Sequence, residues 1–242
     1  MPRPDATVEA QITRFARDVE AALGASLVSI AVYGSAAGDD WIAGRSDVNT
    51  AIVTQAVTLA VLEALAPIVA GVRSRRFALP LVVDRALLDR ARDAFPMELD
   101  DIRRQHRVLA GDDVFAGLVL EREALRRQCE HEARGKILRL RALFLEGADR
   151  PALLEPLMAD SLKTFLVILR HLLRLRGVDG AHGYPEVLAA GESLLGALPV
   201  MRRVLEHRSG AKRLGAATLR AEFGGYLADV ERIVGALDDL DA

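Results

Sequence analysis

The first sixty residues change from helical spacing of apolar positions to short apolar runs. The apolar positions at i, i+3, i+4, i+7 and i+11 are Ile12, Phe15, Ala16, Val19 and Leu23. This spacing predicts one amphipathic helix, which ends at Gly24. Residues 27–33 then form a short, mainly apolar run rich in β-branched side chains, as expected of a buried strand.

The rest of the N-terminal half alternates between the two kinds of pattern. Strands are predicted over residues 47–53 and 77–83, and helices over residues 57–69 and 84–94. The second helix is expected to end before Pro96, because the residue before a proline avoids the α region. One more strand is predicted within residues 97–109, carrying Glu98, Asp100 and Asp101. This order favours an α/β (α+β) fold with a mixed sheet.

The pattern becomes purely helical after residues 111–113. One long helix is predicted over residues 121–146. A second begins near Pro151, where the missing N–H of proline costs nothing, and ends at Arg176. Shorter helices follow at 186–195 and 201–207, and a longer one at 216–237. The strongly apolar helix before Arg176 is expected at the centre of a bundle. We therefore predict an α/β domain over residues 1–115 and an all-α helical-bundle domain over residues 116–242.

Composition and net charge limit which cellular compartment and which classes of binding partner are expected. The net charge of −2 gives no electrostatic reason to expect a nucleic acid as partner. The single cysteine, Cys129, excludes an intramolecular disulfide, fits a reducing cytoplasm and lies where a buried thiol is expected. The N-terminus has no apolar core of the signal-peptide type, and no apolar run is long enough to cross a bilayer. A soluble cytoplasmic protein is expected, and a homodimer is left open.

The polar residues with the clearest chemistry follow the first predicted strand. Gly34 and Ser35 come directly after Tyr33, and the run Ser46-Asp47-Val48-Asn49 begins about a dozen residues later. A Gly-Ser turn offers unobstructed backbone N–H groups and a hydroxyl to an anion such as a phosphate. Side chains two apart on a strand point to the same face, so Asp47 and Asn49 lie together if Val48 faces the core. Their oxygens are the hard ligands that Mg²⁺ prefers.

The run VYGSAAGDDWIAGRSDVNTAIV resembles the motif of the polymerase-beta-like nucleotidyltransferases, and in particular the two-domain aminoglycoside adenylyltransferase branch. The resemblance implies that Gly34, Ser35 and Ser46 bind the triphosphate and that Asp47 binds a metal ion. Asn49 stands where the family has a second metal-binding aspartate. It is thus assigned to the metal site and the catalytic group, but as a neutral amide it brings one carbonyl oxygen and no charge.

The family also has a third acid on a later strand, which serves as a metal ligand or as the base. The predicted strand at residues 77–83 contains no carboxylate. Glu98 is the best remaining candidate, and Asp100 would share its face on a strand. The alternative is that Glu98 is an ordinary solvated acid at a strand edge.

Basic residues of the helical half are the other candidates for nucleotide binding. The resemblance implies that this half supplies basic side chains, for which Arg134, Lys136 and Lys163 are candidates, with Arg170 on the face of Lys163. Gly135, in mid-helix, indicates close backbone packing or approach of a ligand. The alternative is that these cations are solvated and paired with nearby acids such as Glu130.

Three functions remain open from the sequence. The first is Mg²⁺-dependent transfer of AMP, or of another nucleoside monophosphate, from ATP or the corresponding triphosphate to a small hydroxylated acceptor or a protein side chain. The second is a catalytically degenerate protein of the same fold that binds a nucleotide or a partner protein. The third, the nucleotidyltransferase half of a toxin–antitoxin pair, has no residue in its favour. Asn49 separates the first two, because a missing carboxylate weakens charge stabilisation at the metal.

Overall fold

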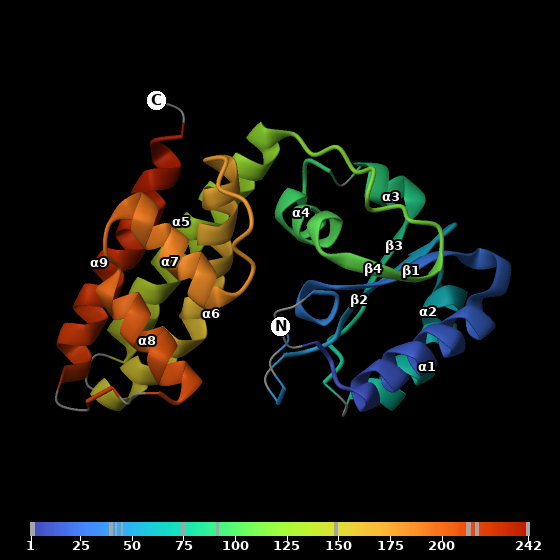
Figure 1. Ribbon diagram of the computed structural model, residues 1–242, viewed down its shortest axis with the longest axis horizontal. Helices are drawn as coiled ribbons and strands as arrows, with labels where there is room; N and C mark the ends of the chain where they lie inside the picture. The colour runs from blue at the N-terminus through green and yellow to red at the C-terminus, as the bar shows by residue number, and fades with distance from the viewer. Residues whose placement is uncertain are drawn as a thin grey trace. The chain divides into compact units, whose positions relative to one another are not determined.

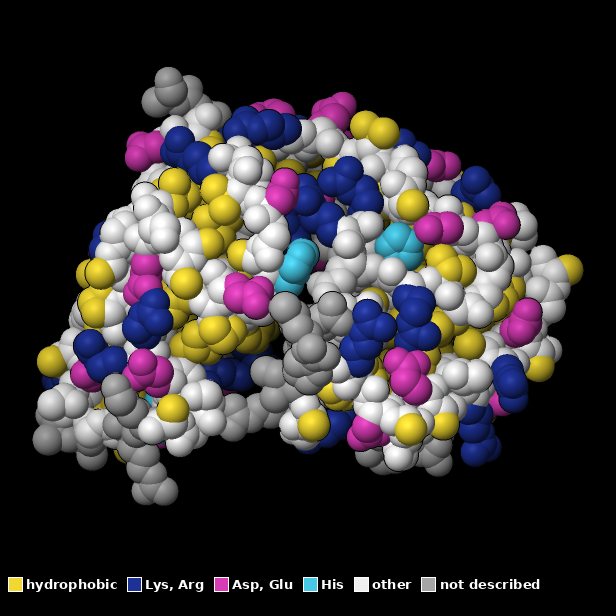
Figure 2. Space-filling view, in the orientation of Figure 1, with side chains coloured by type: hydrophobic (Ala, Val, Ile, Leu, Met, Phe, Trp, Pro, Cys, Tyr) yellow, Lys and Arg dark blue, Asp and Glu magenta, His cyan; other side chains and the backbone are white. Residues whose placement is uncertain are grey.

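The protein forms two compact units, Met1–Ala124 and Leu125–Ala242 (Figure 1). The computed structural model describes residues 3–38, 41, 43–44, 46–73, 76–90, 92–147, 150–211, 214–215 and 218–240. Within these residues no helix is both long and apolar enough to span a membrane. On the face drawn in Figure 2, basic and acidic side chains are interspersed over each unit, in keeping with the net charge of −2.

A four-stranded mixed sheet organises the first unit. Its strands are β1 (Leu27–Tyr33), β2 (Asn49–Thr54), β3 (Leu81–Asp84) and β4 (His106–Gly111). They lie in the order β3-β2-β1-β4. β1 runs antiparallel to both β2 and β4, whereas β2 and β3 are parallel. The α/β class and the mixed sheet predicted from the sequence are confirmed.

Two helices, α1 (Ala6–Leu23) and α2 (Leu59–Val72), cover one face of this sheet (Figure 1). The apolar stripe of α1 is buried in the same cluster as Ile30 of β1 and Ile52 of β2. Asp5 begins α1, because its carboxylate accepts hydrogen bonds from the N–H groups of Thr7 and Val8 at 2.8 and 3.0 Å. Gly24 ends the helix, as its sequence position predicted.

The opposite face is covered by α3 (Arg85–Arg90) and α4 (Pro96–Arg104) (Figure 1). Leu99 and Ile102 of α4 are buried against Ala31 and Ala51 in the middle of the sheet. The face carries a second apolar cluster, which includes Phe115 from the connection after β4. α4 is thereby packed onto this face of the sheet.

The strand predicted to carry Glu98, Asp100 and Asp101 is wrong, because these residues lie on α4. Pro96 stands at the start of this helix, where proline is favoured, and does not merely end the helix before it. On a helix, residues two apart point in nearly opposite directions. Asp100 therefore does not share the face of Glu98. The strand of this region, β4, begins only at His106.

Other strand limits shift by a few residues. β2 begins at Asn49, and Val48 before it forms an isolated parallel bridge with Phe77. Phe77 therefore pairs outside β3, which begins only at Leu81. Proline lacks the N–H that a ladder needs, so Pro80 separates the bridge from the strand.

The second unit is a bundle of α-helices, and its described residues contain no strand. Its helices are α5 (Arg122–Glu146), α6 (Leu154–Leu175), α7 (Tyr184–Leu195), α8 (Pro199–Ser209) and α9 (Leu219–Asp238). α6 packs against α7, α8 and α9 and buries most of its apolar side chains, as predicted for a central helix. Cys129 is buried within α5. The helical C-terminal half is confirmed.

A buried carboxylate joins α8 to α9. Asp229 of α9 accepts hydrogen bonds from the backbone N–H groups of Val200 and Met201 at 2.8 and 2.9 Å. These N–H groups lie in the first turn of α8, where they have no partner within their own helix. Asp229 also accepts from Arg232, at 2.6 Å. A side chain of one helix thus caps the N-terminus of another.

Candidate active site

The Gly-Ser pair forms a tight turn at the end of β1. Gly34 has φ 68, in the left-handed region that favours glycine, and opens a short 3-10 turn, Gly34–Ala36. Its carbonyl accepts hydrogen bonds from the N–H groups of Ala37 and Gly38 at 2.8 and 3.2 Å, and its own N–H donates to Gln105 at 3.0 Å. The turn is therefore held on both sides by backbone hydrogen bonds.

The Asp-Val-Asn run is held by the backbone of Val48. Its N–H donates to the carbonyl of Arg76 at 2.8 Å, and its carbonyl accepts from the N–H of Ala78 at 3.0 Å. The Val48 side chain is fully buried, so the flanking Asp47 and Asn49 point to the other side of the chain. Asp47 is exposed and precedes β2, whereas Asn49 is the first residue of that strand.

The two parts of the motif meet at Gly34 and Asn49. A Cβ atom added to Gly34 would stand 3.4 Å from the side-chain nitrogen Nδ2 of Asn49. Tyr33, the residue before Gly34, lies directly opposite Asn49 in the β1–β2 ladder. The tertiary structure therefore brings the turn and the start of β2 together. Ser35 directly follows Gly34, and Ser46 stands three residues before Asn49.

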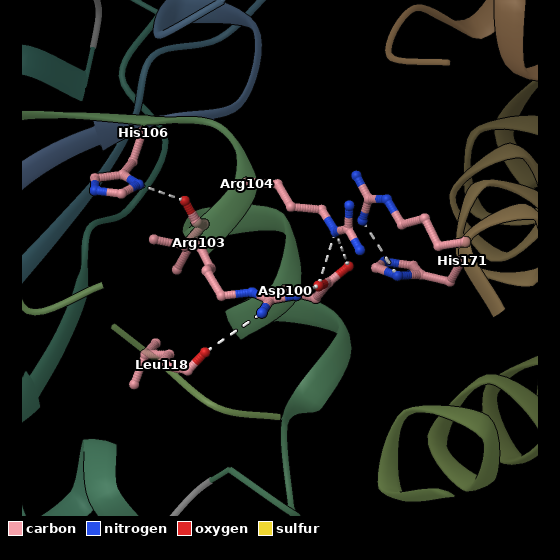
Figure 3. A network of polar contacts seen from close by, with 8 residues as sticks. Asp100, Arg103, Arg104, His106, Leu118 and His171 are labelled. Atoms are coloured by element: carbon pink, nitrogen blue, oxygen red, sulfur yellow. Dashed lines mark hydrogen bonds and ion pairs between the residues drawn. The ribbon is translucent and has the colours of Figure 1, made fainter. Parts of the chain in front are cut away.

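A histidine completes the row across the end of the sheet. His106 of β4 lies opposite Tyr33 on the other side of β1, so Asn49, Tyr33 and His106 occupy one cross-strand row. The ring of His106 contacts the carbonyl oxygen of Ile102 at 2.8 Å (Figure 3). Its other ring nitrogen contacts the Asp113 carboxylate at 3.0 Å. The row is thereby tied to the C-terminal part of α4.

Two acidic residues of α4 affect the pKa of Tyr33, the middle residue of this row. The pKa of Tyr33 is raised, first by burial of its hydroxyl, then by the negative charges of Asp101 and Glu98. These two residues are three apart, so they share one side of the helix. Of these two acids, the family resemblance implies a role for Glu98 but not for Asp101. The signal that would have found it is the i, i+3 spacing of the two acids, which has meaning only on a helix.

Asp100 has a different environment on the same helix. Its side chain is buried and accepts hydrogen bonds from Arg103 at 2.6 Å and from Arg104 at 2.9 and 3.0 Å (Figure 3). A carboxylate held by two guanidinium groups is a structural ion pair that fixes the last turns of α4. The expectation that Asp100 stands beside Glu98 is therefore corrected.

The donor atoms set limits on a metal site. Among the residues that the structure describes, no group of three or more His, Cys, Asp and Glu side chains is arranged to hold a metal ion. Asp47 offers a carboxylate, and Asn49 is a neutral amide. Mg²⁺ often binds through one or two carboxylates together with the phosphates of a substrate. The residues present therefore fit a magnesium ion shared with a triphosphate and do not form a metal cage of their own.

The cations predicted from the helical half lie on α5 and α6. Arg134 pairs with Glu130 at 3.0 Å and with Asp238 at 2.7 Å, and the Lys136 ammonium lies 3.8 Å from Glu132. Lys163 is exposed on α6. The close packing suggested for the mid-helix glycine is not found, because a Cβ on Gly135 would meet no atom within 4 Å. Roles for the three cations in nucleotide binding stay predictions.

Comparison with known proteins identifies the fold. No protein-family model matches the sequence, and no curated protein does. The structure is similar to that of spectinomycin adenyltransferase AAD(9) from Enterococcus faecialis, solved with ATP and spectinomycin. The TM-score is 0.61 at 11% identity, and the match covers 95% of this chain and 99% of the adenyltransferase chain. The chain therefore shares the fold of this adenyltransferase along nearly its full length.

Proposed function

We propose that this protein transfers a nucleoside monophosphate, AMP, from ATP to a small hydroxylated acceptor. The observation that carries the proposal is the approach of Asn49 to Gly34, which places the Gly-Ser turn beside the Asp-x-Asn run in this fold. The likeness to an adenyltransferase solved with ATP and an acceptor supports this choice of reaction.

The phosphates would be bound at the Gly34 turn. Gly34 has no side chain to obstruct a phosphate. Because the N–H groups of Gly34, Ala37 and Gly38 already donate to backbone carbonyls, those of Ser35 and Ala36 are the ones proposed to bind it. The hydroxyls of Ser35 and Ser46 add neutral hydrogen-bond donors. Arg134, Lys136 and Lys163 remain proposed nucleotide-binding cations on the strength of the family resemblance alone.

Asp47 would hold the metal ion together with the phosphate oxygens. Its carboxylate is exposed, and Val48 fixes its backbone on both sides. When bound, Mg²⁺ would offset negative charge on the triphosphate and on the departing pyrophosphate. Every other step belongs to the protein's own residues, which must hold the acceptor oxygen in line with the α-phosphorus.

The reaction needs one base. The acceptor oxygen attacks the α-phosphorus, a new P–O bond forms, the bond to the β-phosphate bridge breaks, and pyrophosphate leaves. The proton of the acceptor hydroxyl passes to a carboxylate, for which we propose Glu98. It is exposed on α4, and its charge reaches Tyr33, which stands next to the Gly34 turn. Asp101, on the same side of α4, is the second candidate.

Three broader features also belong to the proposal. We propose that residues 1–115 and 116–242 act as two domains and that the protein works in the cytoplasm, where the single Cys129 stays reduced. Binding of the triphosphate requires no nucleic acid and no membrane.

Calorimetric titration with ATP and GTP, with and without Mg²⁺, tests the proposal. We expect triphosphate binding that is strengthened by Mg²⁺, and we expect Asp47→Ala to remove most of that gain. Asp18→Ala is the matched control, since Asp18 is an exposed aspartate on α1, across the sheet from α4. Binding that ignores both the metal and Asp47 would contradict the metal assignment.

Pyrophosphate release measures the transfer itself, with spectinomycin as the first acceptor to test because the similar adenyltransferase was solved with it. Pyrophosphate release by the wild-type protein that depends on both ATP and an acceptor would support the proposed transfer reaction. Turnover seen only in Asn49→Asp would contradict it and would indicate a degenerate site.

A further inference from the structure

The side-chain amide of Asn49, and not a carboxylate, lies beside the Gly34 turn. Nδ2 is the atom nearest to the place of a Cβ on Gly34, at 3.4 Å. The side-chain NH₂ group of an asparagine is a donor of two hydrogen bonds and cannot bind a cation. A donor in this place suits the oxygen atoms of a phosphate that is bound at the turn.

The surrounding carboxylates do not make up for the missing charge. Asp47, Glu98 and Asp101 are all described, yet no three acidic or metal-binding side chains of the described chain come together as a metal site. Asp100 is held by Arg103 and Arg104. Bridging two divalent cations requires several anionic oxygens close together, and among the described residues of the motif one acidic side chain, Asp47, offers them.

We propose that this site binds a nucleoside triphosphate with a single divalent cation, held by Asp47 and the phosphates, and that Asn49 donates a hydrogen bond from its amide to the phosphate chain. The inference rests on the proposed function and changes one part of it, because Asn49 then serves as a ligand of the nucleotide and not of a metal ion.

A neutral donor and a carboxylate have opposite effects on a phosphate in the absence of metal. The amide of Asn49 attracts the phosphate oxygens, so part of the triphosphate affinity should survive removal of divalent cations. A carboxylate in its place would repel the same oxygens and would need a cation to bridge them. Loss of a hydrogen bond to a charged group, with added repulsion, corresponds to a fall in affinity of about tenfold or more.

Two measurements on the full chain separate these cases. The first is the dissociation constant of ATP in EDTA, by calorimetry, for wild type, Asn49→Asp and Asn49→Ala. The second is the number of Mn²⁺ ions bound per chain with a non-hydrolysable ATP analogue, by electron paramagnetic resonance. Gln55→Glu is the control, because it makes the same amide-to-acid change just beyond the other end of β2, about 20 Å away.

We expect wild type and Gln55→Glu to bind ATP in EDTA and to take up one Mn²⁺ with the analogue. Asn49→Asp should lose about tenfold or more of the EDTA affinity and gain a second Mn²⁺, and Asn49→Ala should lose affinity without gaining an ion. Two Mn²⁺ ions in wild type, or equal EDTA affinities in wild type and Asn49→Asp, would overturn the inference alone. Absence of triphosphate binding under every condition would instead overturn the proposed function, and circular dichroism would establish that each variant is folded.

Discussion

Tyr33 of β1 lies directly opposite Asn49 of β2 in the antiparallel ladder. Opposite residues on one face of a sheet contact each other, so a change in one side chain affects the other. Tyr33 is also followed directly by the Gly34 turn, and its hydroxyl is influenced by two acids of α4. This one pairing therefore links the turn, the Asp-x-Asn run and the acids on the helix.

The first prediction concerns Gly34. Gly34→Ala should lower the free energy of unfolding by about 1–2 kcal/mol, because alanine is strained at φ 68. The new methyl group would also stand 3.4 Å from Asn49 and should weaken triphosphate binding. Urea unfolding and ATP titration measure the two effects.

Gly135→Ala is the control for the Gly34 substitution. Gly135 lies inside α5, and an added Cβ meets no atom within 4 Å, so alanine should raise the stability by about 1 kcal/mol. If both substitutions changed the stability in the same direction, the conformational argument for Gly34 would fail.

The second prediction concerns the titration of Tyr33. Its pKa lies above the usual 10.0 because of burial, then Asp101, then Glu98. Asp101→Asn should bring the pKa part of the way back, and Glu98→Gln should do so to a smaller extent. Burial, the largest cause, is unchanged in both variants, so the pKa of Tyr33 should stay above 10.0 in both.

The tyrosinate absorbance in the ultraviolet, followed against pH, measures this change. Subtracting the curve of Tyr33→Phe isolates Tyr33 from the chain's other tyrosines, Tyr184 and Tyr226. If neither acid variant moved the midpoint, α4 would not place its acids near the Gly34 turn, and Glu98 would lose its proposed role as base.

The third prediction concerns acid stability. The pKa of Asp113 lies below its usual value, chiefly because its carboxylate accepts the N–H of Ala116, with further bonds from His106 and Phe115. A lowered pKa in the folded state stabilises the protein above the ordinary carboxyl pKa, and this contribution is lost as the pH falls below about 4. Between pH about 5 and about 3, wild type should therefore lose more stability than Asp113→Asn. Urea midpoints across this range test it, and equal losses would argue against the prediction.

The fourth prediction concerns the capping of α8. Asp229→Ala leaves the N–H groups of Val200 and Met201 buried without their acceptor and should cost about 2–4 kcal/mol of stability. Asp229→Asn keeps one side-chain acceptor oxygen and should cost less. Thermal unfolding followed by circular dichroism gives the order of stability of the wild type and the two variants. A smaller loss of stability for alanine than for asparagine would show that the cap contributes little.

Much of the architecture could be predicted from local pattern. The helix ending at Gly24 and the strand 27–33 were found where the spacing of apolar residues placed them, because both bury a continuous apolar surface. The helical C-terminal half followed in the same way. The segment around Glu98 was misassigned, since residues 97, 99 and 102 fit a short strand or a helix almost equally well until Pro96 is recognised as a helix start.

Apart from α4, the order of helices and strands and the run in which Gly34 and Asp47 stand follow from residues near one another in the chain. Long-range packing was needed to place the side chain of Asn49 beside Gly34, to bring Asp101 and Glu98 close enough to affect Tyr33, and to pair Asp100 with arginines. The physical reason is that strand register and the rotation of α4 are set by burial of side chains distant in sequence, among them Ala31 and Ile102.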